Sequence, residues 1–164
     1  MTKPQPEFGE WGPAQRVEIE RSPVWVFARA VKDDNPVYAS AGAAQAAGFD
    51  ASPCPPTYTF VMTHAGAWPD LQPPESAGIR VDVDPDSYVA RKGLFLHGEQ
   101  EFVYHRTPVV GDVLEGRARV SKPFTREGTR RPMEFTLYET VWSDARGNPV
   151  VSERITSIYL PEGA

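Results

Sequence analysis

The second half of the chain, from residue 94 onward, is a succession of long segments with strand-like patterning, and this feature most restricts the possible folds. Each segment is longer than the roughly five or six residues of an average strand, and only short turns separate the segments. Long strands joined by short turns predict an antiparallel meander. The predicted strands are Leu94–Arg106, Val113–Pro123, Pro132–Ser143 and Pro149–Leu160.

The first half carries helix signals after one short predicted strand, Arg16–Glu20. Ser22-Pro23 offers an N-cap and a proline at the first helical position, and Ser40 offers a second N-cap. A third segment is apolar around most of its circumference, as helices enclosed by other structure are. The predicted helices are Pro23–Lys32, Ala41–Ala47 and Thr57–Trp68, and a long loop, Pro69–Ser87, follows them. The fold class is therefore α+β with an antiparallel sheet.

Length and charge limit the remaining classes. A chain of 164 residues predicts one domain, residues 1–164, of which residues 1–15 read as a loose N-terminal arm. A net charge of −5 without a basic cluster argues against a nucleic-acid partner. Cys54 is the only cysteine, which favours a reducing compartment, and no segment reaches membrane-spanning length. We expect a cytoplasmic protein with no membrane partner. Cys54 lies among prolines and is a weak candidate for a nucleophile.

The segment Asp33-Asp34-Asn35-Pro36-Val37-Tyr38 resembles the Gly-Asp-x-Asn-Pro-x-His motif of MaoC-type (R)-specific enoyl-CoA hydratases. Lys32 stands at the position of the motif's glycine, and Tyr38 stands at the position of its histidine. Two further stretches, Pro55-Pro56-Thr57 and Leu96–Arg106, resemble the N-terminal MaoC dehydratase group. That group includes the accessory subunits of heteromeric (R)-specific enoyl-CoA hydratases and (3R)-hydroxyacyl dehydratases of fatty-acid or steroid metabolism.

The resemblance implies a single hot-dog fold, in which a long antiparallel sheet wraps around the central helix. It implies an acyl-thioester substrate carried by coenzyme A or by an acyl carrier protein, a second hot-dog subunit as partner, and neither cofactor nor metal. It places Asp33 and Tyr38 at the catalytic positions. The implied substrate-binding residues are Asn35, Pro56, Thr57 and Tyr58.

Hydration of an enoyl thioester needs a base that activates water, an acid that protonates the α-carbon, and donors for the thioester oxygen. In the resembled family an aspartate and a histidine share the water, and amides near the start of the central helix hold the oxygen. Tyr38 has an ordinary pKa of about 10 and accepts a proton poorly at neutral pH. We therefore expect this chain to be the non-catalytic half of a hydratase or dehydratase, which completes the dimer and shapes the acyl tunnel.

Other interpretations stay open at this point. Asp-Asp-Asn-Pro after a helix is also an ordinary turn signal. A hot-dog acyl-CoA thioesterase could use Asp33 or Glu99, and a third possibility is a non-enzymatic homodimer that binds acyl thioesters. His97, Glu99, Glu101 and His105 share one face of an unbroken strand, where a solvated or subunit-facing role is favoured over a metal site. His64, in the apolar helix, is expected to be a core or pocket residue.

Overall fold

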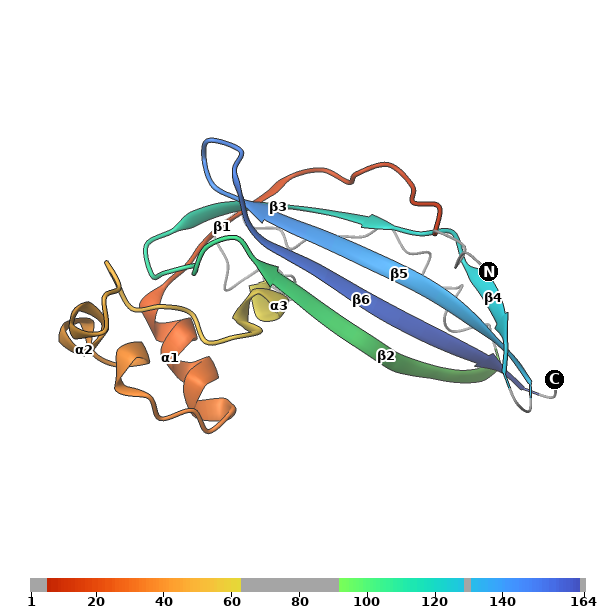
Figure 1. The fold of residues 1–164 in the computed structure, drawn as a ribbon, viewed down its shortest axis with the longest axis horizontal. Coiled ribbons are helices and arrows are strands. Elements are labelled where there is room, and N and C mark those ends of the chain that lie inside the picture. Colours follow the sequence, from red (N-terminus) through yellow and green to blue (C-terminus); the bar gives the residue numbers. More distant parts are fainter. Residues whose placement is uncertain (1–5, 63–91, 129–130, 163–164) are drawn as a thin grey trace.

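The computed structural model describes residues 6–62, 92–128 and 131–162. A strongly elongated antiparallel sheet forms one part of the molecule, and short helices gather at one end of it (Figure 1). The strands are β1 (Gln15–Glu18), β2 (Gly93–Tyr104), β3 (Val113–Val120), β4 (Phe124–Glu127), β5 (Pro132–Ser143) and β6 (Pro149–Pro161). The helices are α1 (Arg21–Ala30), the 3-10 helix η1 (Pro36–Tyr38), α2 (Ala41–Ala46) and α3 (Tyr58–Met62). The predicted α+β class is confirmed.

The expected meander is wrong in its strand order. The order is β1-β3-β5-β6-β2, with β4 paired to β5, so β2 lies beside β6 and far from β3, which follows it in sequence. The connection between β2 and β3 crosses to the other side of the sheet. An ion pair of 2.6 Å between Arg106 and Asp112 holds this connection, and the Asp112 carbonyl accepts the Ile19 amide proton beside β1. The sequence also missed β4, which begins after the chain bends at Ser121–Pro123.

The apolar helix predicted over Thr57–Trp68 is described only in its first part, α3. The rest of that helix, His64 and the predicted loop Pro69–Ser87 lie outside the described residues. The described helices include none that is long and apolar enough to cross a membrane.

The sheet has two unlike faces. The face that carries Trp142 and Val151, which lie opposite each other in β5 and β6, packs against α1 and α3 and is called the inner face. The buried core on this side consists of Ile19, Val24, Cys54, Tyr58, Met62, Leu114, Trp142, Val150 and Val151. Strand alternation places the neighbours of these strand residues on the opposite, outer face.

The described part of the N-terminal arm, which begins at residue 6, is hydrogen-bonded to the sheet, although the arm was predicted to be loose. The amides of Gly9 and Gly12 donate to carbonyls of β3 at 2.9 and 2.8 Å, and the Lys122 amide donates to the Glu7 carbonyl at 2.7 Å. The rings of Phe8 and Trp11 each lie 4.4 Å from the guanidinium carbon of Arg119, on the outer face. Figure 1 shows this segment running alongside β3. The arm therefore acts as a short extension of the sheet.

A bulge at Gly98 interrupts β2. The register with β6 shifts between His97 and Glu99, so Phe95 and Phe102 lie on the same face although seven positions separate them. A Cβ atom at Gly98 would lie 2.8 Å from Cδ1 of Ile158, which is closer than real contacts allow. The expectation that His97 shares a face with Glu99 and Glu101 is therefore wrong: His97 lies on the inner face and the two glutamates on the outer one.

Candidate functional site

The motif turn begins at the end of α1. Lys32 has a φ of 60°, the left-handed conformation that favours glycine. The Asp33 amide donates to the Ala28 carbonyl at 2.9 Å, and the Lys32 amide donates to the Arg29 carbonyl at 3.1 Å. This pair of bonds is the Schellman termination, which normally has glycine at the position of Lys32. The replacement of the motif's glycine therefore leaves the turn in place, at a cost in backbone strain.

Asp33 and Asn35 each serve the local backbone. The Asn35 amide donates to Oδ1 of Asp33 at 3.1 Å, and the Val37 amide donates to Oδ1 of Asn35 at 3.2 Å. Asn35 thereby caps η1, which carries Tyr38 into the interior. The interpretation of this segment as a turn is correct, because Asp33 and Asn35 both bond to backbone amides within it. The same turn places Tyr38 close to Asp33. The binding role assigned to Asn35 stays a prediction.

Tyr38 is 8% exposed, and its hydroxyl group lies close to the Asp33 carboxylate. Burial raises the pKa of Tyr38 above 10.0, and the negative charge of Asp33 and the hydrogen bond to it raise this pKa further. The residue at the histidine position is therefore a neutral phenol at neutral pH. The structure brings the two residues of the predicted catalytic pair together. Tyr38 stays protonated at neutral pH, however, so it cannot act with Asp33 as a base toward water.

The loop before α3, which carries Cys54, lies near the motif turn. Cys54 lies next to Tyr38 and Tyr58, and its amide donates to the Pro108 carbonyl at 2.9 Å. Burial, followed by the charge of Asp112, raises the pKa of the Cys54 thiol to about 12. A thiol with this pKa is protonated at neutral pH and is no nucleophile.

The residues assigned to substrate binding before α3 are split by the structure. Pro56 and Thr57 are exposed, whereas Tyr58 is buried with its ring edge-to-face with Phe27 at 5.6 Å. Thr57 has a φ of 70°, an uncommon conformation for a β-branched residue. The Thr57 amide donates to the hydroxyl oxygen of Tyr104 at 2.9 Å. Sequence reasoning missed Tyr104, because no pattern in a strand end points to a residue 47 positions earlier.

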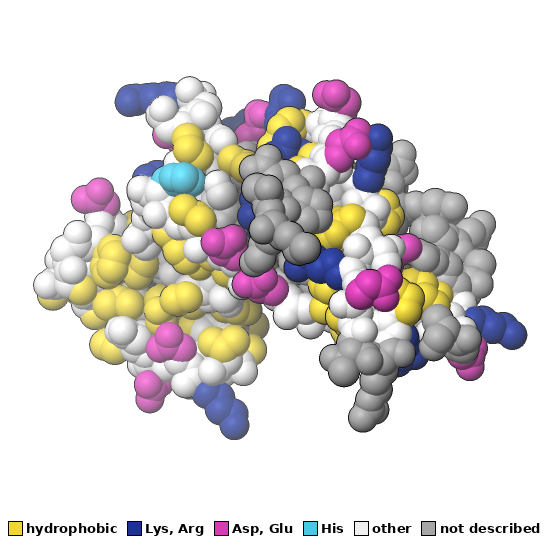
Figure 2. Space-filling view, turned by 45° about the vertical axis from the view of Figure 1, so that its right-hand side comes forward, with side chains coloured by type: hydrophobic (Ala, Val, Ile, Leu, Met, Phe, Trp, Pro, Cys, Tyr) yellow, Lys and Arg dark blue, Asp and Glu magenta, His cyan; other side chains and the backbone are white. Residues whose placement is uncertain are grey.

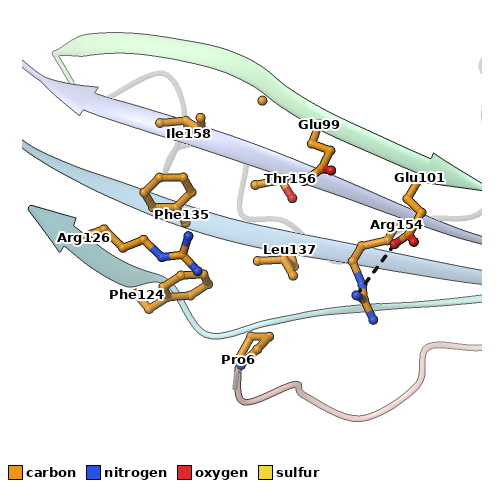
Figure 3. A pocket seen from close by; sticks show the side chains of 11 residues that line it. Pro6, Glu99, Glu101, Phe124, Arg126, Phe135, Leu137, Arg154, Thr156 and Ile158 are labelled. Atoms are coloured by element: carbon orange, nitrogen blue, oxygen red, sulfur yellow. Dashed lines mark ion pairs between the residues drawn. The ribbon is translucent and has the colours of Figure 1, made fainter. Parts of the chain in front are cut away.

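A hollow of about 380 Å³ lies on the outer face beside the N-terminal arm (Figure 3). The stacked rings of Phe124 and Phe135 form one end, and Glu99, Glu101 and Arg154 lie at the other. Glu99 is thus on the face of the sheet that turns away from α3. A thioesterase carboxylate beside the central helix cannot be Glu99, which removes one of the two residues offered for that activity.

Figure 2 shows hydrophobic side chains spread over the helical end of the molecule. On α1, Trp25 and Val26 are 42% and 59% exposed, and Val31, just after the helix, is 53% exposed. Large exposed apolar side chains in one region mark a surface that another protein can cover.

Comparisons with known proteins agree with this geometry. The family described as FAS1-like, dehydratase domain region, matches residues 7–153. A UPF0336 protein of Saccharopolyspora erythraea is 26% identical over 149 residues, which is 91% of this chain and 85% of the relative. A UPF0336 protein of Parafrankia is 32% identical over 122 residues, 74% of this chain and 72% of the relative. The match to one of Streptomyces avermitilis, 34% identical, covers 62% of this chain and 60% of that protein.

Solved structures share the fold at low identity. The C-terminally truncated HadBC (3R-hydroxyacyl-ACP dehydratase) complex of Mycobacterium tuberculosis has a TM-score of 0.67 at 22% identity, covering 95% of this chain and 98% of that one. The ChsH1–ChsH2 complex of the same organism has a TM-score of 0.72 at 20% identity, covering 94% and 86%. The R-hydratase PhaJ1 of Pseudomonas aeruginosa has a TM-score of 0.60 at 19% identity, covering 95% and 83%. The predicted hot-dog fold is confirmed.

Proposed function

This chain belongs to the FAS1-like dehydratase-region family, together with the UPF0336 proteins, and from that membership we propose that it is a subunit of an (R)-specific enoyl-thioester hydratase or 3-hydroxyacyl dehydratase. It is the non-catalytic half, which completes the dimer and shapes the acyl tunnel. A partner hot-dog subunit supplies the aspartate–histidine pair. The observation that carries this proposal is the buried Tyr38 side chain beside Asp33, a protonated phenol at the position where a base should stand.

The chemistry explains why this substitution matters. During hydration a base takes one proton from water, the hydroxide forms a bond to the β-carbon, and the α-carbon takes up a proton. The base must be unprotonated near neutral pH. Tyr38, with a raised pKa, is protonated there and competes with water for the Asp33 carboxylate. Asp33 and Tyr38 are therefore better suited to a structural role in the turn than to proton transfer.

The start of α3 adds a second argument. In the resembled family, amides near this point stabilise the thioester oxygen. Here the Thr57 amide is occupied by the Tyr104 hydroxyl group of the same chain. An amide that is already bonded offers no donor to a developing negative charge. The position of the base and the position of the oxygen-binding amide therefore both differ from what an active hydratase needs.

The free edge of β2 supports a partner subunit. β2 has 12 residues and ends the strand order, and its other side has no paired strand among the described residues. Leu94, Leu96, Val103 and Tyr104 of this strand are 40–52% exposed. An unpaired strand of this length with apolar side chains is a template for another strand. HadBC and ChsH1–ChsH2 are complexes of two different chains, which agrees with a heteromer.

The proposed substrate is an acyl thioester of coenzyme A or of an acyl carrier protein, and the proposed location is the cytoplasm. The test is a hydration assay that follows loss of the enoyl absorbance of trans-2-enoyl-CoA. We expect little or no activity from the purified chain, and activity after co-expression with a hot-dog subunit that carries the complete Gly-Asp-x-Asn-Pro-x-His motif. Asp33→Asn should leave the heteromer's activity close to wild type, while the matching change in the partner's motif should abolish it. Efficient hydration, or thioester hydrolysis, by this chain alone would overturn the proposal.

A further inference from the structure

The free edge of β2 has an ordered pattern on the outer face. Because of the Gly98 bulge, this face of β2 carries two leucines, two glutamates and a valine in succession: Leu94, Leu96, Glu99, Glu101 and Val103. The apolar positions lie toward both ends of the strand, and the acidic ones lie in the middle. A strand that pairs antiparallel along this edge would therefore meet apolar side chains at its ends and carboxylates at its centre.

Within the described part of the chain, the two carboxylates are only weakly neutralised. Glu99 and Glu101 project from β2 to the same side as Arg154 of β6 (Figure 3). The Glu101 side chain is 59% exposed and lies 3.9 Å from an Arg154 guanidinium nitrogen, which is long for an ion pair. Arg154 makes its shorter contacts with Glu139, and Glu139 also pairs with Arg119 at 2.6 Å. Glu99 is exposed and forms no ion pair within the described residues.

A second copy of this chain fits the edge badly. With the bulged Gly98 left out, the middle pairing position of β2 is Glu99. A two-fold antiparallel pairing with full overlap therefore sets Glu99 opposite Glu99 of the second copy, and each Glu101 lies diagonal to it. Moving the two-fold axis by one position, to Gln100, sets Glu99 opposite Glu101. Like charges directly opposite each other destabilise a strand pair. The apolar side chains favour pairing with an antiparallel strand, and in these two registers the repulsion between glutamates disfavours pairing with a second copy.

We propose that Glu99 and Glu101 make the free edge of β2 a charge-selective interface. The edge disfavours pairing with a second copy of this chain and favours pairing with an antiparallel strand of a different hot-dog subunit, one that carries Lys or Arg opposite the two glutamates. The selection works against the wrong partner as well as for the right one, as in other specific protein pairs. This inference rests on the proposed function for the existence of a hot-dog partner, and it specifies that partner's chemistry.

The test is a charge swap that needs no natural partner. Wild type and the variant E99K/E101K, each labelled with a different fluorophore, are studied alone and as an equimolar mixture by sedimentation velocity and energy transfer. We expect the mixed dimer to form about tenfold or more tightly than either homodimer, because only the mixture sets lysine against glutamate. Added salt should weaken the mixed dimer. The neutral variant E99Q/E101Q should self-associate more tightly than wild type.

The matched control is E18K, which makes the same change on β1, the opposite edge strand. A mixture of wild type and E18K should associate no more tightly than wild type alone. The inference is overturned if wild type self-associates as tightly as the mixture with E99K/E101K, or if neutralising both glutamates leaves self-association unchanged. Because the readout is assembly and no substrate is present, this failure is distinct from a failure of the proposed function, which is measured as hydration by the lone chain.

Discussion

The hydroxyl oxygen of Tyr104, at the end of β2, lies 2.9 Å from the backbone nitrogen of Thr57, which directly precedes α3. An edge strand and the start of the core helix are thereby tied together by one side chain. The same contact occupies the Thr57 amide, which under the proposed function would be free to donate to a thioester oxygen in an active hydratase.

Tyr104→Phe should lower the free energy of unfolding by about 0.5–1.5 kcal/mol, because the Thr57 amide loses its acceptor at a site that water can reach. Urea denaturation measures the stability, and hydrogen exchange by NMR should show faster exchange of the Thr57 amide. Tyr159→Phe is the control, since its hydroxyl group donates to the Lys92 carbonyl at 2.8 Å instead. Unchanged protection of the Thr57 amide in Tyr104→Phe would contradict the assigned contact.

Restoring the histidine should not be sufficient for activity. Tyr38→His recreates the motif, but the Thr57 amide stays occupied by Tyr104. We expect little hydration of enoyl-CoA by Tyr38→His, and a measurable gain when Tyr104→Phe is added to it. Initial rates of both variants and of Tyr104→Phe alone, at equal concentration of folded protein, measure this difference. Equal activity of the single and the double variant would show that the Thr57 amide plays no part.

Lys32→Gly should stabilise the chain by about 0.5–1 kcal/mol. A non-glycine residue in the left-handed region costs roughly 1–2 kcal/mol, and the greater freedom of glycine in the unfolded state offsets part of that gain. Lys32→Ala, which retains a Cβ atom at a φ of 60°, should change the stability little. Thermal unfolding of the three proteins decides this, and a Lys32→Gly variant less stable than Lys32→Ala would show that the lysine side chain itself contributes.

Gly98→Ala should destabilise the chain by about 1–3 kcal/mol, as expected for overpacking. The added methyl group would lie 2.8 Å from the Ile158 side chain and 3.1 Å from the Thr156 carbonyl oxygen. Gly42→Ala, in α2, is the control, because its new Cβ atom would meet only Ser40 at 3.8 Å. A Gly98→Ala variant with wild-type stability would mean that β2 can rearrange without the bulge.

The stability should fall at alkaline pH. The pKa of Cys54 is raised from 9.0 to about 12 in the folded state, so the folded chain holds the thiol proton more tightly than the unfolded chain. The corresponding stability is fully present below pH 9 and is lost as the pH rises toward 12, by about 2–4 kcal/mol. The raised pKa of Tyr38 adds to the loss above pH 10. Cys54→Ala should flatten the profile between pH 9 and 10, and a profile parallel to wild type in this interval would argue against the assignment.

The sequence by itself determined the elements whose causes are local. The lengths of β5 and β6 follow from apolar alternation between turn residues, and α2 begins at the predicted N-cap, Ser40. The predicted start of α1 is wrong: the helix begins at Arg21, and its N-cap position is Glu20 rather than Ser22. The nearness of Tyr38 to Asp33 also follows from a short segment, because Asn35 caps η1 within that turn. Periodicity and capping operate over a few residues, so they can be read in order along the chain.

Only the tertiary structure decided how distant segments meet. The position of β2 beside β6 depends on a connection that crosses the sheet, and no local pattern distinguishes that path from a meander. The Gly98 bulge reverses the faces of β2, since one extra residue moves every later side chain to the other side. The contact of Tyr104 with Thr57 arises from both facts. These features were fixed by the packing of the whole sheet, because the free energy of pairing distant strands depends on partners that local sequence does not name.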